Sequence, residues 1–296
     1  MLRAHGRYAY SAITRRAPYR WPAGEGLAIY VALNLEHYAF GEGLSEELVP
    51  GAGQPDVLNH SWREYGNRVG AWRLLELFEE LRLPATVLVN SALYEESPEL
   101  IAAFRARGDE VAGHGRTNSE KQTGLDESEE RALIEGVTRT IAHYEGEAPR
   151  GWLGPWIAET LVTPDLLHEL GYAYVLDWCA DDQPVWLKTR SGRILAVPYP
   201  QELNDSSTVI GRRASAAEFA DMIVQQFDEM LEQSARQPLV MGLALHPYIV
   251  GQPFRLRHLR NAFTHCLAQR SRIWLTRPRD IAQFCADLPA GVVPGG

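Results

Sequence analysis

The 296-residue chain is predicted to be an α/β protein, a single barrel of about seven strand–helix units. Strand-like and helix-like segments alternate along it without a linker or a shift in composition. Three strand-like runs also end in ionisable groups: 28–35 runs into Glu36-His37, 109–112 into Gly113-His114, and 239–245 into His246. Because the carboxyl ends of parallel strands open onto a common site, these side chains are expected to converge.

The individual elements follow from periodicity and end signals. Strands are predicted at 28–35, 85–89, 109–112, 151–153, 173–177, 194–199, 239–245 and 272–275. Helices are predicted at 69–81, 99–107, 127–145, 164–170, 216–233, 256–269 and 279–286. The clearest helix start is Asp126, because Glu129 three positions later completes a capping box. Residues 38–60, which contain Gly and Pro, are predicted to form a long loop.

The domain organisation follows from the same reading. We expect an N-terminal arm over 1–20, one barrel domain over 21–288 and a loose tail over 289–296. The arm and the loop 38–60 are longer than ordinary connections in a compact barrel. They are therefore expected to pack across a symmetric interface in a homodimer or homotetramer.

Composition excludes several function classes. A formal net charge of −9 disfavours nucleic acid or an anionic membrane as the main partner. No apolar run approaches the length of a membrane span, and residues 1–20 lack the apolar core of a signal peptide. The 3 cysteines are expected to be free thiols, which favours a cytoplasmic location. The partner that remains is a small-molecule substrate.

The strand-end residues suit amide hydrolysis, which needs an activated water, an oxyanion donor and a proton for the leaving nitrogen. Glu36 is predicted to be the general base, with burial expected to raise its pKa toward neutrality, and His246 the general acid. Backbone N–H groups around Gly154 and Trp156 are candidates for the oxyanion. His37 and His114 either bind a metal or form a hydrogen-bonded polar cluster.

Several longer motifs resemble the polysaccharide deacetylase superfamily, which folds as an irregular (β/α) barrel. The resemblance is greatest to the branch of metal-independent allantoinases and cyclic imide hydrolases, and it covers about 21–288. The motifs that carry it are 64–73 (EYGNRVGAWR), 177–186 (DWCADDQPVW), 197–199 with Asn204-Asp205, 242–246 (GLALH) and 279–282 (RDIA). The resemblance and the residue chemistry together predict these substrate-binding residues: Arg63, Tyr65, Asn67, Arg68, Pro155, Trp156, Trp178, Asp182, Asn204 and Asp205.

The chain also differs from the superfamily pattern at several motif positions. The usual Asp-Asp pair is Glu36-His37 here, and the usual His-x-x-x-His is His114 with Asn118. A third superfamily motif reads Arg-x-Pro-aromatic, and in this chain Leu153 stands in the arginine position. The implied metal ligands are therefore His37, His114 and Asn118. Because asparagine is a weak transition-metal ligand, we expect no firm cofactor and at most one weakly held divalent metal such as zinc.

The function predicted from these residues is hydrolysis of a non-peptide C–N bond in a small amide, ureide or cyclic imide by base-activated water. One alternative is a carbohydrate de-N-acetylase. Another is a barrel that has lost catalysis and only binds a ligand, which the altered Glu36-His37 and Asn118 positions keep open. Family and fold do not fix the substrate.

Overall fold

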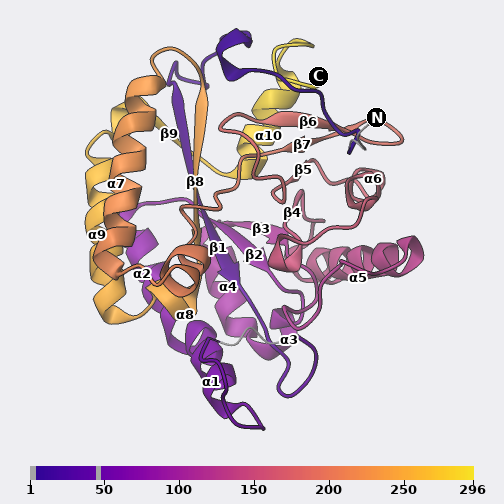
Figure 1. The fold of residues 1–296 in the computed structure, drawn as a ribbon, viewed down its shortest axis with the longest axis vertical. Coiled ribbons are helices and arrows are strands. Elements are labelled where there is room, and N and C mark those ends of the chain that lie inside the picture. Colours follow the sequence, from indigo (N-terminus) through magenta and orange to yellow (C-terminus); the bar gives the residue numbers. More distant parts are fainter. Residues whose placement is uncertain (1–4, 45–47) are drawn as a thin grey trace.

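The computed structural model describes residues 5–44 and 48–296, which form an α/β fold around one strongly curled sheet (Figure 1). Its strands are β1 Leu27–Leu35, β2 Thr86–Val89, β3 Glu110–Gly113, β4 Gly151–Trp152, β5 Tyr174–Val175, β6 Val185–Lys188, β7 Arg193–Ala196, β8 Leu239–Leu245 and β9 Ile273–Leu275. The α-helices are α1 Val57–Tyr65, α2 Ala71–Leu81, α3 Leu93–Glu96, α4 Pro98–Arg107, α5 Glu127–Glu145, α6 Thr163–Glu169, α7 Ala216–Gln233, α8 Pro247–Val250, α9 Pro253–Leu267 and α10 Pro278–Asp287. Short 3-10 helices are η1 Ile13–Arg15, η3 Pro155–Ile157 and η5 Arg270–Arg272, and π-helices are η2 Gly66–Gly70 and η4 Ser206–Gly211.

Strand β1 is the centre of the sheet, and every one of its residues is buried. The strand order is β6-β7-β5-β4-β3-β2-β1-β8, with β9 paired to β1 as well. Along one edge of β1 its first residues pair with β9 and its last with β2, while the other edge pairs with β8. All pairs are parallel except the hairpin β6–β7. The carboxyl ends of β1, β3, β4 and β8 are thereby brought to one end of the sheet.

The sheet curls into an irregular barrel rather than a regular eight-stranded one. Its end strands β6 and β8 are bridged by irregular chain: Val240 N–H donates to Asp182 O at 2.9 Å, and Ala244 N–H donates to Leu203 O at 3.0 Å. The interior is filled by small, aliphatic and aromatic residues, such as Ala32, Leu195 and Tyr30. At Gly242 an added Cβ would lie 2.7 Å from the Tyr30 hydroxyl, so this close approach requires glycine. The predicted α/β barrel fold is confirmed.

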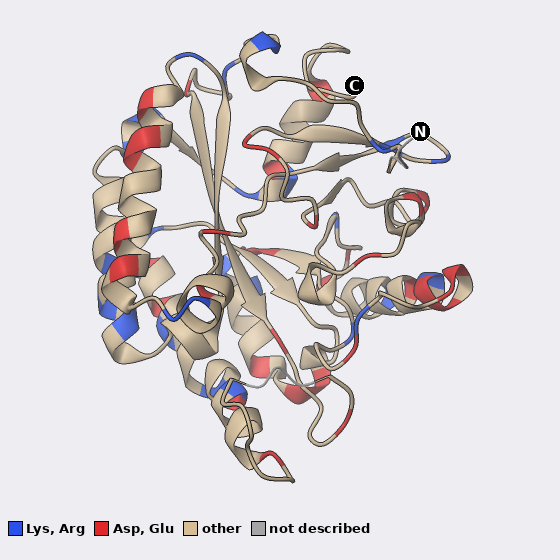
Figure 2. Cartoon of the chain, viewed as in Figure 1, with Lys and Arg blue, Asp and Glu red and all other residues tan. Residues whose placement is uncertain are grey.

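Element boundaries follow mostly from local signals. The predicted helices 127–145 and 216–233 are exactly α5 and α7, since each begins with a complete capping box, at Asp126 and at Ser215. Helices α7 and α9 pack against each other on the outside of β8 (Figure 1). The charged residues of α7 are all acidic and the Lys and Arg residues of this helix pair all lie on α9, whereas α5 carries both signs (Figure 2).

Two sequence-based expectations about elements are wrong. The loop 38–60 is shorter than predicted, because α1 begins at Val57, with Asp56 accepting from Asn59 N–H at 3.0 Å. Strand β6 was missed: the eight predicted strand ranges correspond to eight of the nine strands in the described chain, and the ninth is 185–188, which forms an antiparallel hairpin with β7. The parallel strand–helix pattern does not predict such a hairpin.

Both ends of the described chain lie on β6 (Figure 1). Lys188 N–H donates to Arg7 O at 2.7 Å, and Trp186 N–H donates to Pro294 O at 2.8 Å. Arg7 also forms an ion pair with Asp165 at 2.7 Å. The arm over 5–20 thus packs along its own barrel. In the described part of the chain, no helix is long and apolar enough to span a membrane.

Candidate active site

Strand β1 brings two polar side chains, Asn34 and Glu36, to a cavity of about 250 Å³ at the carboxyl ends of the strands. They share a face because side chains alternate along a strand. His37, the next residue, is not among the residues that line the cavity. Its backbone is used instead: its N–H donates to Asn90 Oδ1 at 2.8 Å, and its carbonyl accepts from Asn118 N–H at 2.8 Å.

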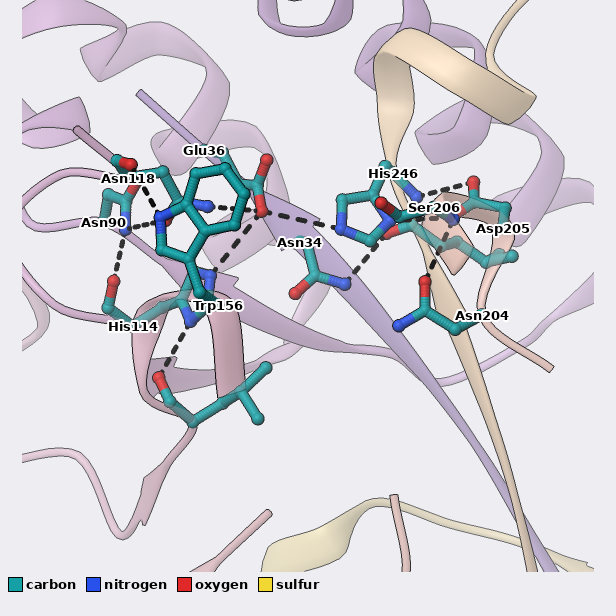
Figure 3. A network of polar contacts seen from close by, with 12 residues as sticks. Asn34, Glu36, Asn90, His114, Asn118, Trp156, Asn204, Asp205, Ser206 and His246 are labelled. Atoms are coloured by element: carbon teal, nitrogen blue, oxygen red, sulfur yellow. Dashed lines mark hydrogen bonds and ion pairs between the residues drawn. The ribbon is translucent and has the colours of Figure 1, made fainter. Parts of the chain in front are cut away.

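The Glu36 carboxylate is the meeting point of the site (Figure 3). Asn118 Nδ2 donates to Glu36 Oε1 at 2.7 Å. The Nε2 atoms of His246 and His114 lie 3.5 Å and 3.7 Å from the same oxygen. The Tyr38 hydroxyl donates to the other oxygen, Oε2, at 3.1 Å. Residues from distant parts of the sequence therefore surround one buried carboxylate.

His246 is held between two carboxylates. Its Nδ1 lies 2.6 Å from Asp205 Oδ1, and its backbone N–H donates to Asp205 Oδ2 at 2.8 Å. Since an ionised carboxylate only accepts, Nδ1 carries the hydrogen and Nε2 is directed to Glu36. Burial opposes the charge on His246, but Asp205 and Glu36 raise its pKa to about 10. The ring is therefore an imidazolium at neutral pH.

Glu36 is ionised at neutral pH for the complementary reason. Burial acts to raise its pKa, but the positive charge of His246 and its hydrogen bond to the carboxylate outweigh burial and hold the pKa well below the usual range of a glutamate. The rise toward neutrality that was expected from burial is therefore not found. The site thus contains a carboxylate beside an imidazolium, which are the protonation states that a general base and a general acid need.

His114 presents an acceptor to the same space. Its Nδ1 lies 2.8 Å from the carbonyl oxygen of Leu153. Because a carbonyl only accepts, Nδ1 carries a hydrogen, and in the tautomer with one ring hydrogen Nε2 keeps its lone pair. This Nε2 is buried and has no hydrogen-bond partner among the described residues. It is therefore available to a water or to a substrate N–H.

Trp156 forms one wall of the cavity, and Figure 3 shows its ring beside the Glu36 cluster. Its Nε1 donates to Asn118 O at 2.9 Å, and its φ of 67° lies in the left-handed region. The Gly154 N–H donates to Asp177 Oδ1 at 2.9 Å, so it is not free to bind an oxyanion as predicted. That leaves the Trp156 N–H, for which the described residues offer no backbone acceptor.

Two of the predicted substrate-binding residues, Trp156 and Asn204, line the cavity. Two others support it from behind. Asp205 contacts His246 rather than the cavity, and Asn67 Nδ2 donates to the backbone carbonyl of Glu36 at 2.8 Å. Pro155 packs against Gly115, where an added Cβ would lie 2.5 Å from its Cγ. These last three side chains contact other residues of the site and do not line the cavity in this structure.

The remaining predicted substrate-binding residues lie elsewhere. Arg63 is buried with its guanidinium 3.5 Å from the centre of the Tyr38 ring, and the Tyr65 hydroxyl accepts from Arg73. Arg68 is exposed at the surface. Trp178 and Asp182 each line a different hollow from the candidate cavity. The sequence motifs that contain these residues did not show which of their side chains turn toward the cavity.

Several lining residues were not predicted from the sequence. They are Asn34, Tyr38, Leu153, Ile157, Tyr199, Gln201, Ser206, Ser207, Gly211 and Tyr248. Asn90, which follows β2 directly, was also missed. It donates from Nδ2 to Asn118 Oδ1 at 3.0 Å and so fixes which end of that amide faces Glu36. Asn34 and Asn90 had a usable signal: one lies two residues before Glu36 in the same strand, and the other stands at a strand end.

The described residues do not fit the metal site that the resemblance implied. His37 does not line the cavity, and Asn118 turns its amide nitrogen toward it while its oxygen accepts from Asn90. An amide NH₂ group is a donor and cannot ligate a cation. His114 is then the only one of the three predicted ligands that presents a lone pair. No group of three His, Cys, Asp or Glu side chains in the described ranges is arranged to hold a metal ion.

Comparisons with known proteins agree on one superfamily. Residues 64–175 match the family model for polysaccharide deacetylases. A Schizosaccharomyces pombe protein, named provisionally as a polysaccharide deacetylase, is 26% identical over 238 residues, which are 74% of this chain and 73% of that protein. The crystal structure of PuuE allantoinase superposes with a TM-score of 0.79 and 27% identity, covering 91% of this chain and 93% of that one. A probable polysaccharide deacetylase from Pseudomonas aeruginosa gives 0.77 and 27%, covering 89% and 92%.

Proposed function

Since the chain belongs to the polysaccharide deacetylase superfamily and is a hydrolase of carbon–nitrogen bonds other than peptide bonds, we propose that its substrate is a small cyclic imide, ureide or amide. The observation that carries this proposal is the environment of Glu36. Its Oε1 accepts from Asn118 and faces the Nε2 atoms of His246 and His114. A base, an acid and a further acceptor thus share one small cavity.

The proposed reaction uses these groups directly. A water beside Glu36 and His114 loses a proton to one of these acceptors as its oxygen attacks the substrate carbonyl carbon. The Trp156 N–H is the candidate donor to the developing oxyanion. His246 then donates its Nε2 proton to the nitrogen as the C–N bond breaks, and Asp205 stabilises the imidazolium before that transfer. The products are a carboxylate and a released N–H group, joined in one molecule when the substrate is a ring.

The cavity itself supports a small, planar, amide-rich substrate. Its volume of about 250 Å³ lies below the range of about 300–1,000 Å³ typical of drug-sized ligands. Amide side chains of Asn34, Gln201 and Asn204 line it. Amides pair with the alternating N–H and C=O groups of an imide or ureide. The likeness to PuuE allantoinase points the same way.

A carbohydrate de-N-acetylase is the second candidate, favoured by the family model and by the name of the Schizosaccharomyces pombe relative. The two candidates need the same bond cleavage but different amounts of room. A hydrolysis panel of cyclic imides, ureides and N-acetylated sugars separates them. Release of ring-opened acid from an imide or ureide, abolished in Glu36→Gln, supports our proposal. Acetate release from N-acetyl sugars alone would overturn it in favour of the second candidate. Saturable ligand binding without any turnover would favour the barrel that has lost catalysis.

A further inference from the structure

A second cavity, of about 520 Å³, lies at the opposite end of the parallel strands from the candidate site. Residues that directly precede β4 and β5, and the first residue of β7, line it together with helix α10, which packs beside β5 (Figure 1). Strand β4 runs between the two cavities, because Arg150 before it lines this one and Leu153 after it lines the candidate site. The two cavities share no lining residue.

Positive charge is concentrated in this second cavity. Its lining contains the arginines Arg150, Arg193 and Arg279, against one acidic residue, Asp280. The arginines come from three separate elements: one precedes β4, one begins β7 and one lies in the first turn of α10. Asp280 is itself paired with a further arginine, Arg277, at 2.9 Å. In a chain whose formal net charge is −9, such a cluster favours an anionic ligand.

The carboxylates of the chain leave the three guanidinium groups able to donate. Within the described part of the chain, the side chains of Arg150 and Arg193 form neither an ion pair nor a hydrogen bond. Arg279 has two carboxylates nearby, those of Asp280 and Glu147, but at 3.8 Å and 4.0 Å they lie beyond hydrogen-bond distance. The N–H groups of all three arginines are therefore available to an anion in the cavity.

Arg193 is held in place without an anion. Its guanidinium lies over the buried ring of Trp186, 4.3 Å from the ring centre. The hairpin sets this contact, because Trp186 pairs with Leu195, and Arg193 two residues earlier on β7 shares that face of the sheet. His168 Nδ1 lies 3.0 Å from the Ser191 hydroxyl in the hairpin turn. A guanidinium that is fixed by stacking keeps its N–H groups free and loses less side-chain entropy when it binds a ligand.

We propose that this second cavity binds a phosphate group, free or in a small phosphate monoester, through Arg150, Arg193 and Arg279. Guanidinium groups pair bidentately with phosphate oxygens, and a phosphate monoester offers about two negative charges against the single charge of a carboxylate. The volume of about 520 Å³ lies within the range of about 300–1,000 Å³ typical of small-molecule sites. Trp186 and Ala282 give the cavity apolar walls for an organic group beside the phosphate. This site does not depend on the proposed function.

Calorimetry of the full chain with phenyl phosphate, inorganic phosphate and benzoate tests the class of ligand. Phenyl phosphate should bind saturably, with one molecule per chain. Benzoate has the same ring but a single charge, so it should bind at least about tenfold more weakly. Tighter binding of phenyl phosphate than of inorganic phosphate supports a monoester site, and equal binding supports a site for the free ion. Benzoate binding as tight as that of phenyl phosphate, or no saturable binding of either phosphate, would overturn the proposal.

Three variants, Arg150→Gln, Arg193→Gln and Arg279→Gln, test where the phosphate binds. Each keeps a polar side chain but removes a charged donor, so each should weaken the binding of phenyl phosphate about tenfold, while thermal unfolding shows that the fold is retained. Arg190→Gln is the matched control, because Arg190 stands in the same hairpin turn but pairs with Glu169 and does not line the cavity. Binding that is unchanged in all three cavity variants, or weakened equally in the control, would show that the phosphate binds elsewhere and would overturn the proposal.

Discussion

The side-chain amide of Asn118 donates a hydrogen bond to the Glu36 carboxylate, with 2.7 Å between Nδ2 and Oε1. A histidine is expected at this position from the superfamily motif, and its imidazole would offer a lone pair. The amide offers a hydrogen instead, and Asn90 holds it in that orientation. Glu36 is therefore bound by its neighbours as an anion, in the place where a cation would otherwise be coordinated.

Glu36→Gln tests the general base. Because the amide cannot accept a proton from water, turnover should fall at least about a hundredfold, while the fold is retained. Steady-state hydrolysis measures the first effect and thermal unfolding the second. Glu120→Gln is the control: this carboxylate pairs with Arg116 outside the cavity, and its loss should leave turnover unchanged. Equal activity of native protein and Glu36→Gln would remove Glu36 from the mechanism.

Asp205→Asn tests the origin of the imidazolium. The substitution keeps an acceptor for His246 but removes a negative charge, so the pKa of His246 should fall from about 10 toward neutrality. The alkaline limb of kcat/KM should then move to lower pH, and the NMR titration of the His246 ring should move with it. Asp228→Asn is the control, because it changes the exposed pair between Asp228 and His265. A His246 titration unchanged in Asp205→Asn would contradict the assignment.

Glu110→Gln tests a buried carboxyl away from the candidate site. Burial raises the pKa of Glu110 from 4.5 to about 7, against the donors Thr86 and Tyr174. Because the folded-state pKa is raised, this group's contribution to stability is complete below about pH 4.5 and is lost as pH rises to about 7. That difference corresponds to about 3 kcal/mol. Denaturant unfolding should show this decline in the native chain and a flatter profile in Glu110→Gln; parallel profiles would contradict it.

How far the sequence predicts the site is clearest at the strand ends. Glu36, His114 and His246 follow three strand-like runs far apart in the chain, and their convergence follows from the parallel sheet. The sequence could also have shown that Glu36 rather than His37 faces the cavity. Side chains alternate between the two faces of a strand, so Glu36 lies on the same face as Asn34, which lines the cavity.

Other parts of the site depend on information that the sequence does not contain. The orientation of the Asn118 amide is set by Asn90, which is remote in sequence and has no motif of its own. The turn that places Trp156 at the cavity has a left-handed φ of 67° at this residue, which no local propensity predicts. Arg63 and Tyr65 lie on helix α1, Val57–Tyr65, which was not predicted. Without that helix, the sequence could not show which way their side chains point.

We propose that the chain forms a homodimer or homotetramer, as expected from the long N-terminal arm over 1–20 and the long loop over 38–60. Apolar side chains gather around α1: Phe40, Val57 and Leu58 are 53%, 59% and 51% exposed. Covering such surface would stabilise an interface. Light scattering at micromolar concentration should show more than a monomer, and Leu58→Glu should dissociate it. Leu161→Glu, at a 70% exposed leucine elsewhere, is the control. A native monomer would contradict the proposal.

The last prediction concerns metal dependence, where the donor set gives a definite expectation. Glu36 and His114 are the groups that offer lone pairs in the cavity, because Nε2 of the His246 imidazolium carries a proton. Two ligands are fewer than the three protein ligands typical of catalytic zinc, and Glu36 cannot act freely as a base while it coordinates a metal. Exhaustive chelation should therefore leave hydrolysis unchanged. Asn118→His should create a second imidazole beside His114 and raise zinc affinity, measured by calorimetry, while turnover falls because the donor to Glu36 is lost. Loss of native activity on chelation, with recovery on adding zinc, would show instead that the amide of Asn118 reorients to admit a metal.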